Sequence, residues 1–271
     1  MSGEVGVAVR DIETGNDFGY NASEIFPTAS TLKVPLIYAL YRRAEASEID
    51  LTERVTLSYT NRVPGSGVLQ HMDEGLQPTL RDLAELMIIV SDNWATDLLW
   101  NRLTKSTVDA TLAEIGMGQT SLPYTIYELF ATLAEADPSA PETTYEYLET
   151  FLKDYDPKPD NPAMVFDARN DTSSPVDMVR LLTAIDAGEG IEASRRRELA
   201  PQRIPAVEDP TQVDQRVGIA LVRREIGKTG QRTFELRQLV PRLRLRRQIL
   251  GLKHEEPVSY THLTLPTIYS V

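Results

Sequence analysis

Apolar residues recur at helical spacing through most of residues 79–135, which predicts a run of helices near 79–90, 93–103, 106–115 and 124–135. The run is interrupted at Ser91-Asp92-Asn93 and again at Gly116-Met117-Gly118, where turn-forming residues cluster. Further helices are expected near 143–153 and from Ser174 onward, with Ser174 as the cap and Pro175 at the first helical position. A large part of this chain must therefore pack helix against helix.

The start of the chain has a different period. In "EVGVAVRDI" (residues 4–12) the valines alternate along the sequence, and the polar residues 14–17 form a turn signal before a second short strand near 18–20. A helix follows from the segment "TLKVPLIYAL", in which Pro35 is tolerable only within the first turn. Residues 218–229 could form a returning strand. These patterns predict an α/β part that is interrupted by an inserted helical part.

Composition restricts the chemistry. The absence of cysteine excludes disulfides and thiolate chemistry, and the presence of only three histidines makes a histidine-rich metal site unfavourable. The net charge is −12, and residues 1–230 carry 21 basic against 37 acidic side chains. So acidic a surface repels nucleic acid and anionic membranes, and no apolar run is long enough to span a bilayer.

Ser30 and Lys33 are three positions apart at the start of the expected helix after the hairpin. Residues at this spacing lie on one face, so the lysine amine could take the proton of the serine hydroxyl if burial lowers the pKa of the amine. The spacing alone is weak evidence, because a capping serine beside a solvated lysine gives the same pattern.

Two further triplets strengthen this interpretation. Ser91-Asp92-Asn93 forms a tight connection between two apolar helices, where a hydroxyl and an amide can project into a cleft. Lys228-Thr229-Gly230 follows the expected returning strand, and its ammonium and hydroxyl suit a substrate carboxylate, while the glycine allows close approach of a ligand. Each triplet alone could be an ordinary turn, but chance would rarely place all three in one chain in this order.

With these triplets, and with "GSGVLQH" (65–71), "LRDLAELMIIVSDNWATDLL" (80–99) and "NDTSSPVDMVRLL" (170–182), residues 4–230 resemble the class A serine β-lactamases and their penicillin-recognising relatives. The resemblance implies an α/β plus all-α fold whose antiparallel sheet combines strands from both chain ends around an inserted helical subdomain. We expect one domain over 1–230, with the α/β part at about 1–45 and 200–230 and the helical part at about 46–199.

The resemblance also implies the roles of the site residues. Ser30 would be the acylated nucleophile, Lys33 its general base or proton relay, and Ser91 a proton shuttle to the leaving nitrogen. The substrate-binding set would be Asn93, Lys228, Thr229, Gly230 and Gln231, with the backbone N–H groups of Ser30 and Gln231 as the oxyanion hole. The implied activity is hydrolysis of a β-lactam through an acyl-serine by a monomer without cofactors. Alternatives are a D-Ala carboxypeptidase, transpeptidase or esterase of the same fold that takes a D-Ala-like peptide or ester, or a binding module that does not turn over.

One expected element is missing. Class A enzymes carry a loop glutamate, followed four residues later by asparagine, before the segment that corresponds to "TSSP", and this chain has no such pair there. The nearest substitute is Asp156 in "DYDPKPDN", with Asn161 five residues later. Glu142, Glu146 and Glu149 are alternatives whose spacing suits the solvated face of a helix. His71 receives no role.

The end of the chain departs from the family pattern. Residues 231–257 switch to a basic, arginine- and leucine-rich composition, which favours a reading-frame shift over an amphipathic helix. "VSYTHLTLPTIYSV" (258–271) resembles a translated sequencing adapter, so we exclude it from the fold. No signal peptide is visible, which gives two expectations: a cytoplasmic protein as the sequence stands, or a secreted or periplasmic one if the chain is truncated at both ends.

Overall fold

The structure is a computed structural model, and it describes residues 4–12, 14–155, 158 and 160–188 together with the backbone of 217–224. Its strands are β1 (Glu4–Asp11), β2 (Asp17–Tyr20), β3 (Phe26–Pro27), β4 (Thr172–Ser173) and β5 (Val217–Arg224). Its α-helices are α1 (Lys33–Glu45), α2 (Leu80–Ile89), α3 (Asn93–Leu103), α4 (Lys105–Glu114), α5 (Ile126–Leu133), α6 (Tyr145–Lys153) and α7 (Pro175–Ala187). Short 3₁₀ turns cover Ala29–Leu32, Tyr59–Asn61, Leu69–His71 and Pro162–Met164. The expected helices are therefore present, within one to two residues at most ends.

The main sheet has the strand order β2-β1-β5 and is antiparallel throughout. β1 pairs with β2 through the predicted hairpin, whose turn uses Gly15 at a positive φ of 71°. β1 also pairs along its whole length with β5, from Glu4 opposite Arg224 to Asp11 opposite Val217. The sheet thus joins segments about 200 residues apart, as the resemblance implied, and the part of the returning strand expected at 225–229 lies outside the described residues.

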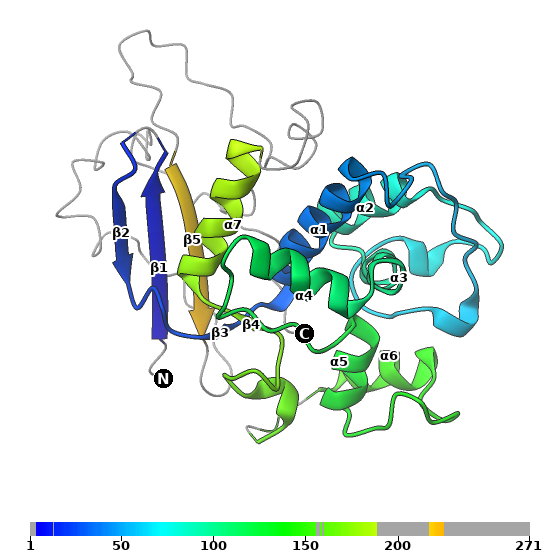
Figure 1. Cartoon of the computed structure of the whole chain (residues 1–271). Helices are drawn as coiled ribbons and strands as arrows, with labels where there is room; N and C mark the ends of the chain where they lie inside the picture. Colours follow the sequence, from blue (N-terminus) through cyan, green and yellow to red (C-terminus); the bar gives the residue numbers. More distant parts are fainter. Residues whose placement is uncertain (1–3, 13, 156–157, 159, 189–216, 225–271) are drawn as a thin grey trace, which may run out of the picture.

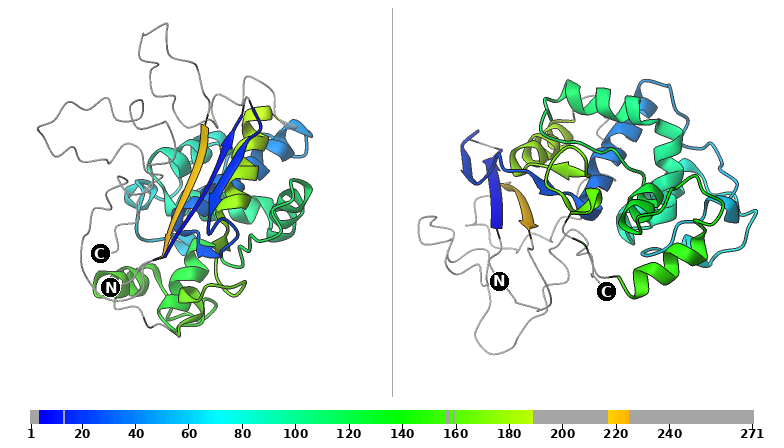
Figure 2. Two further views of the ribbon diagram at one scale, coloured as in Figure 1. Left: turned by 90° about the vertical axis from the view of Figure 1, so that its left-hand side faces the viewer. Right: turned by 90° about the horizontal axis from the view of Figure 1, so that it is seen from below.

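The described helices lie on one face of this sheet, and α7 is the one that packs against β1 and β5 (Figures 1 and 2). Beyond α7, α1 packs against α3 and α4, and α3 packs against α2 and α5. The expected division had placed α1 with the sheet and residues 46–199 with the helical part. α7 packs on the sheet, and its buried face includes Met178, Val179 and Leu181. The expected division of the domain stays a prediction.

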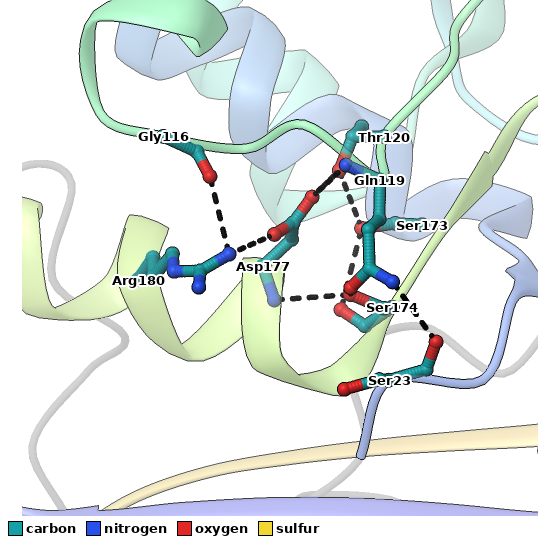
Figure 3. Close-up of polar contacts among 8 residues, drawn as sticks. All are labelled: Ser23, Gly116, Gln119, Thr120, Ser173, Ser174, Asp177 and Arg180. Carbon is teal, nitrogen blue, oxygen red and sulfur yellow. Dashed lines mark hydrogen bonds and ion pairs between the residues drawn. The ribbon is translucent and has the colours of Figure 1, made fainter. Parts of the chain in front are cut away.

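A polar network at the start of α7 joins this helix to the helical part (Figure 3). The fully buried Asp177 accepts hydrogen bonds from the Gln119 amide (2.8 Å) and the Thr120 hydroxyl (3.0 Å), and it pairs with Arg180 (2.7 Å). Ser174 is the N-cap, as predicted, and it also donates to the Gln119 side chain at 2.9 Å. Because buried polar groups must be paired, this network fixes α7 relative to the loop after α4.

The core lies among α1, α2, α3 and α7. Its largest fully buried side chains include Trp94, Tyr38 and Tyr41. α2 begins with a capping box, in which Thr79 and Asp82 exchange hydrogen bonds with each other's backbone. In the part of the chain that the structure describes, no helix is long and apolar enough to cross a membrane.

Candidate active site

Ser30 lies in the 3₁₀ turn that leads directly into α1. The turn is anchored by Thr28, whose amide and hydroxyl both donate to the carbonyl of Asp171, at 2.9 and 3.1 Å. Ala29, just before the serine, has a left-handed φ of 47°, a conformation that side chains seldom adopt. Ser30 itself is half-buried, so its hydroxyl is fixed at the start of a helix and is still reachable from solvent.

Lys33, the first residue of α1, is 2% exposed. Its ammonium donates to the Ser91 carbonyl (2.7 Å), the Ser91 hydroxyl (2.8 Å) and Asn93 Oδ1 (2.9 Å). All three acceptors are uncharged and come from the connection between α2 and α3. The lysine therefore has three hydrogen bonds, and none of the carboxylates that the structure describes pairs with it directly.

Ser91 links the lysine to the candidate nucleophile, because its hydroxyl donates to Ser30 Oγ at 3.1 Å. The i,i+3 spacing had suggested direct contact between Lys33 and Ser30. The hydrogen bonds of Lys33 go to Ser91 and Asn93 instead, so the two residues communicate through Ser91. The structure thus brings Ser30, Lys33, Ser91 and Asn93 into one hydrogen-bonded cluster.

Burial lowers the pKa of Lys33 to about 8, against the opposing influence of the carboxylates of Asp92 and Asp97. A buried amine loses hydration that only its charged form enjoys in water. At pH 7 about a tenth of the molecules then carry a neutral Lys33, far more than for a lysine in water. The amine is available as a base near neutral pH.

The connection between α2 and α3 is held in a defined shape. Ser91 has a left-handed φ of 54°, and Asp92 caps α3 by accepting from the Ala95 amide at 3.0 Å. The other oxygen of Asp92 accepts from the amides of Val68 and Leu69, at 2.7 and 2.8 Å. The aspartate of the triplet therefore organises backbone, while its neighbours on both sides contact Lys33.

Asn93 is 5% exposed, and its amide nitrogen donates to the Pro64 carbonyl at 3.0 Å. Since its oxygen accepts from Lys33, the amide plane is fixed at both ends. An amide nitrogen has two hydrogens, so one donor remains for a ligand.

The comparisons with known proteins can be set beside this geometry. A sequence model of the beta-lactamase enzyme family matches residues 1–201. The chain belongs to this family. Among curated relatives, Beta-lactamase L2 of Stenotrophomonas maltophilia is 27% identical over 84% of this chain and 62% of its own length. The beta-lactamase regulatory protein BlaB of Streptomyces cacaoi is 30% identical over 49% of this chain and 43% of its own.

Solved structures agree on the fold. A beta-lactamase from Sphaerobacter thermophilus superposes with a TM-score of 0.55 at 28% identity, covering 73% of this chain and 62% of that one. PBP-A superposes with the same TM-score at 22% identity, covering 74% and 63%. The class A β-lactamase-like fold expected from the sequence is thereby confirmed. The chain spans less than two thirds of the length of these proteins.

Several predicted site residues lie outside the described part of the structure: Asp156, Lys228, Thr229, Gly230 and Gln231. Of the alternative glutamates, Glu142 and Glu146 are exposed, and Glu149 pairs with Lys153 at 3.3 Å and accepts from the Tyr145 hydroxyl at 3.4 Å. None of these three hydrogen-bonds to the Ser30 cluster within the described residues. Their roles, like those of the five residues outside, stay predictions.

His71, which received no role, is exposed and lines a cavity of about 270 Å³ together with five other residues: Gly65, Gln70, Glu149, Leu152 and Lys153. Over the described ranges, no three side chains of metal-binding type gather into a site.

Two buried carboxyls beside the cluster were not singled out from the sequence. Asp97 accepts from the amides of Ile126 (2.7 Å) and Tyr127 (2.9 Å), and burial raises its pKa to about 7. Asp171 accepts from the Tyr124 amide (3.2 Å), and burial raises its pKa to about 7 as well. Asp171 lies in the quoted "NDTSSP" segment, so the segment was noted, but its burial could not be seen from the sequence.

Proposed function

We propose that this chain is a serine hydrolase that opens β-lactams through an acyl-serine intermediate on Ser30. The observation that carries the proposal is the hydrogen-bonded path from buried Lys33 through Ser91 to Ser30, with distances of 2.8 and 3.1 Å. A serine needs a base to become a nucleophile, and this chain offers one whose pKa is about 8. Membership of the beta-lactamase enzyme family supports the same chemistry.

The acylation step follows from the geometry. A neutral Lys33 keeps two N–H donors, which can remain on the Ser91 carbonyl and Asn93 Oδ1, while its lone pair accepts the Ser91 hydroxyl proton. Ser91 then accepts the proton of Ser30 as the serine oxygen bonds to the lactam carbonyl carbon. When the ring C–N bond breaks, Ser91 gives this proton to the nitrogen and takes its own proton back from the Lys33 ammonium, 2.8 Å away, so that both residues return to their starting forms. Protons and electrons balance, and Ser30 is left as an ester.

Substrate binding is assigned to the residues that the family pattern names. Asn93 would donate its remaining hydrogen to the side-chain amide of the substrate, and Lys228 with Thr229 would bind its carboxylate. The oxyanion would be held by the backbone N–H groups of Ser30 and Gln231. The protein is proposed to act as a monomer, which analytical ultracentrifugation tests.

Release of the acyl group requires an activated water, and Asp156 is the proposed base. Intact mass measured over time with a penicillin, beside hydrolysis of a chromogenic cephalosporin, tests the function. We expect an adduct that forms and disappears with turnover, no adduct in Ser30→Ala, and a persistent adduct in Asp156→Asn. The exposed Asp154→Asn variant is the matched control and should turn over like the parent.

The Ser91→Ala variant tests the proton path. Loss of a positioned proton carrier costs about 100- to 10,000-fold in rate, so acylation should slow by that factor without loss of folding. A parent adduct that persists would indicate a penicillin-binding protein or a binding module that does not turn over. The absence of any adduct in the parent would contradict the acyl-serine proposal.

A further inference from the structure

A short segment covers the connection between α2 and α3. We call residues Gly65–Leu69 the strap. The backbone N–H of Asn93 donates to the Ser66 carbonyl at 3.0 Å, and the backbone N–H groups of Val68 and Leu69 donate to the Asp92 carboxylate. Gly67 lies so close that a Cβ atom there would be 2.3 Å from Asp92 Cγ. With the hydrogen bond from the Ser66 hydroxyl to the Ser91 carbonyl, the strap contacts all three residues of the Ser91-Asp92-Asn93 triplet.

The side chain of Ser66 makes the contact that no role yet explains. Its hydroxyl donates to the Ser91 carbonyl at 2.9 Å and lies 3.3 Å from Asn93 Oδ1. These are the same two oxygens to which Lys33 donates, at 2.7 and 2.9 Å. The hydroxyl and the amine therefore share both of their carbonyl-type acceptors.

Sharing acceptors has an electrostatic consequence. An oxygen that already accepts one hydrogen bond offers less negative potential to a second donor, and a charged donor loses more by this than a neutral one. By competing for these two oxygens, the Ser66 hydroxyl weakens the hydrogen bonds of the charged amine and so favours the neutral form of Lys33. The carboxylates of Asp92 and Asp97 have the opposite effect, because they favour the charged form. The hydrogen bond of 2.9 Å from the Ser66 hydroxyl also helps to hold the Ser91 carbonyl in place.

We propose that Ser66 is a positioning residue that holds the Ser91 carbonyl and the Asn93 amide and lowers the proton affinity of Lys33. The proposal rests on the function proposed above, in which neutral Lys33 is the base for acylation. Ser66 itself need not touch the substrate for this role.

The direct test is a titration of Lys33 by ¹³C NMR of its ε-carbon, with the resonance assigned by its loss in Lys33→Met. In Ser66→Ala we expect the Lys33 midpoint to rise by about half a pH unit to one unit, the equivalent of one ordinary hydrogen bond. Ser66→Thr keeps a hydroxyl and should restore the parent value, and Ser66 is exposed enough to accept the methyl group. Ser139→Ala, which removes an exposed hydroxyl bonded to Asp137, is the matched control.

An unchanged Lys33 midpoint in Ser66→Ala, or an equal rise in Ser139→Ala, would overturn the proposal. Acylation by a penicillin should follow the titration, with the acid limb of its pH profile moved up by the same amount in Ser66→Ala. The NMR measurement does not depend on acylation. If the parent forms no acyl-enzyme, the proposed function fails while the titration still decides the role of Ser66.

Discussion

Three buried side chains near Ser30 have pKa values moved toward neutrality. Burial lowers the pKa of the Lys33 amine to about 8 and raises those of the Asp97 and Asp171 carboxyls to about 7. The cause is common to all three, because each charged form loses hydration when it is enclosed by protein. The consequences differ. Lys33 becomes available as a base near neutral pH, whereas the charged forms of Asp97 and Asp171 become unfavourable in the folded protein.

The Lys33 value predicts a pH profile. In the proposed mechanism the neutral amine is the acylating form, so the rate of adduct formation should rise about tenfold per pH unit below pH 8 and level off above it. Stopped-flow measurements with a fluorescent penicillin between pH 6 and 9.5 check this. A rate independent of pH across that window would remove Lys33 from the role of base.

Asp171 predicts a dependence of stability on pH. Its Oδ2 is buried without a hydrogen-bond partner in the described structure. Since its folded pKa is raised, the folded state keeps a proton that the unfolded state releases above about pH 4, so stability is lost as pH rises from about 4 to 7. Asp171→Asn should remove this loss and gain about 2 to 4 kcal/mol relative to the parent at pH 8, with little gain at pH 4.

Urea unfolding at both pH values measures the effect of Asp171→Asn. The exposed Asp154→Asn variant supplies the control, because it should follow the parent at each pH. An Asp171→Asn variant that differs from the parent by the same amount at pH 4 and pH 8 would show that the carboxyl is charged in the folded protein.

At the scale of elements, the strap and the triplet between α2 and α3 form one structural unit. The strap is anchored on its other side by Gln70, which donates to the carbonyls of Gly65 and Gly67 and accepts from the Tyr145 hydroxyl of α6 at 3.0 Å. Arg62 stacks on the Tyr145 ring with 4.0 Å between its Cζ and the ring centroid. The shape of the site is thus supported by a loop and a helix that supply no residue to the Ser30 cluster.

Gly67 should be the most sensitive position of the strap. It has a φ of 112°, and an added Cβ would collide with Asp92. Gly67→Ala should therefore destabilise the protein by about 2 kcal/mol or more and slow acylation. Gly75→Ala separates the two causes, because Gly75 has a similar φ of 88° but open space around it. Equal losses of unfolding free energy in the two variants would show that only backbone conformation matters.

In the molecule as a whole, the main sheet and the helices are joined by close contacts between β1, β3 and α7. Gly6 on β1 lies at this junction, since a Cβ there would be 2.4 Å from the Phe26 ring and 2.9 Å from Pro175 at the start of α7. β1, α7 and the short two-stranded sheet of β3 and β4 meet at a point with no room for a methyl group.

This junction allows a test of cooperativity. The two tryptophans of the chain, Trp94 and Trp100, are both in α3, so their fluorescence reports on the helical part. Gly6→Ala should lower the free energy of unfolding by about 1 to 3 kcal/mol through overpacking. If sheet and helices unfold together, the unfolding transition followed by tryptophan fluorescence should shift by this amount, although the substitution is in the sheet. Gly118→Ala, in open space, is the neutral control. A tryptophan transition unmoved by Gly6→Ala would mean that the two parts unfold independently.

The local features of this protein could be predicted from its amino-acid sequence. Ser174 and Pro175 predicted the start of α7, and the alternating valines predicted β1. The polar triplets carried the resemblance to the family, and the resemblance implied that Ser30 is the nucleophile. Such signals depend on near neighbours and on a regular period, which a sequence displays directly.

Three features became visible only in the folded chain. They are the hydrogen-bonded path from Lys33 through Ser91 to Ser30, the packing of α7 on the sheet, and the two oxygens that Ser66 and Lys33 share. The hydrogen bonds between Lys33 and Ser91 join positions 58 apart in the chain, and burial moves the pKa of Asp97 and Asp171 through atoms from several elements. Contacts and desolvation of this kind arise when the core packs, so they leave no periodic signal in the sequence.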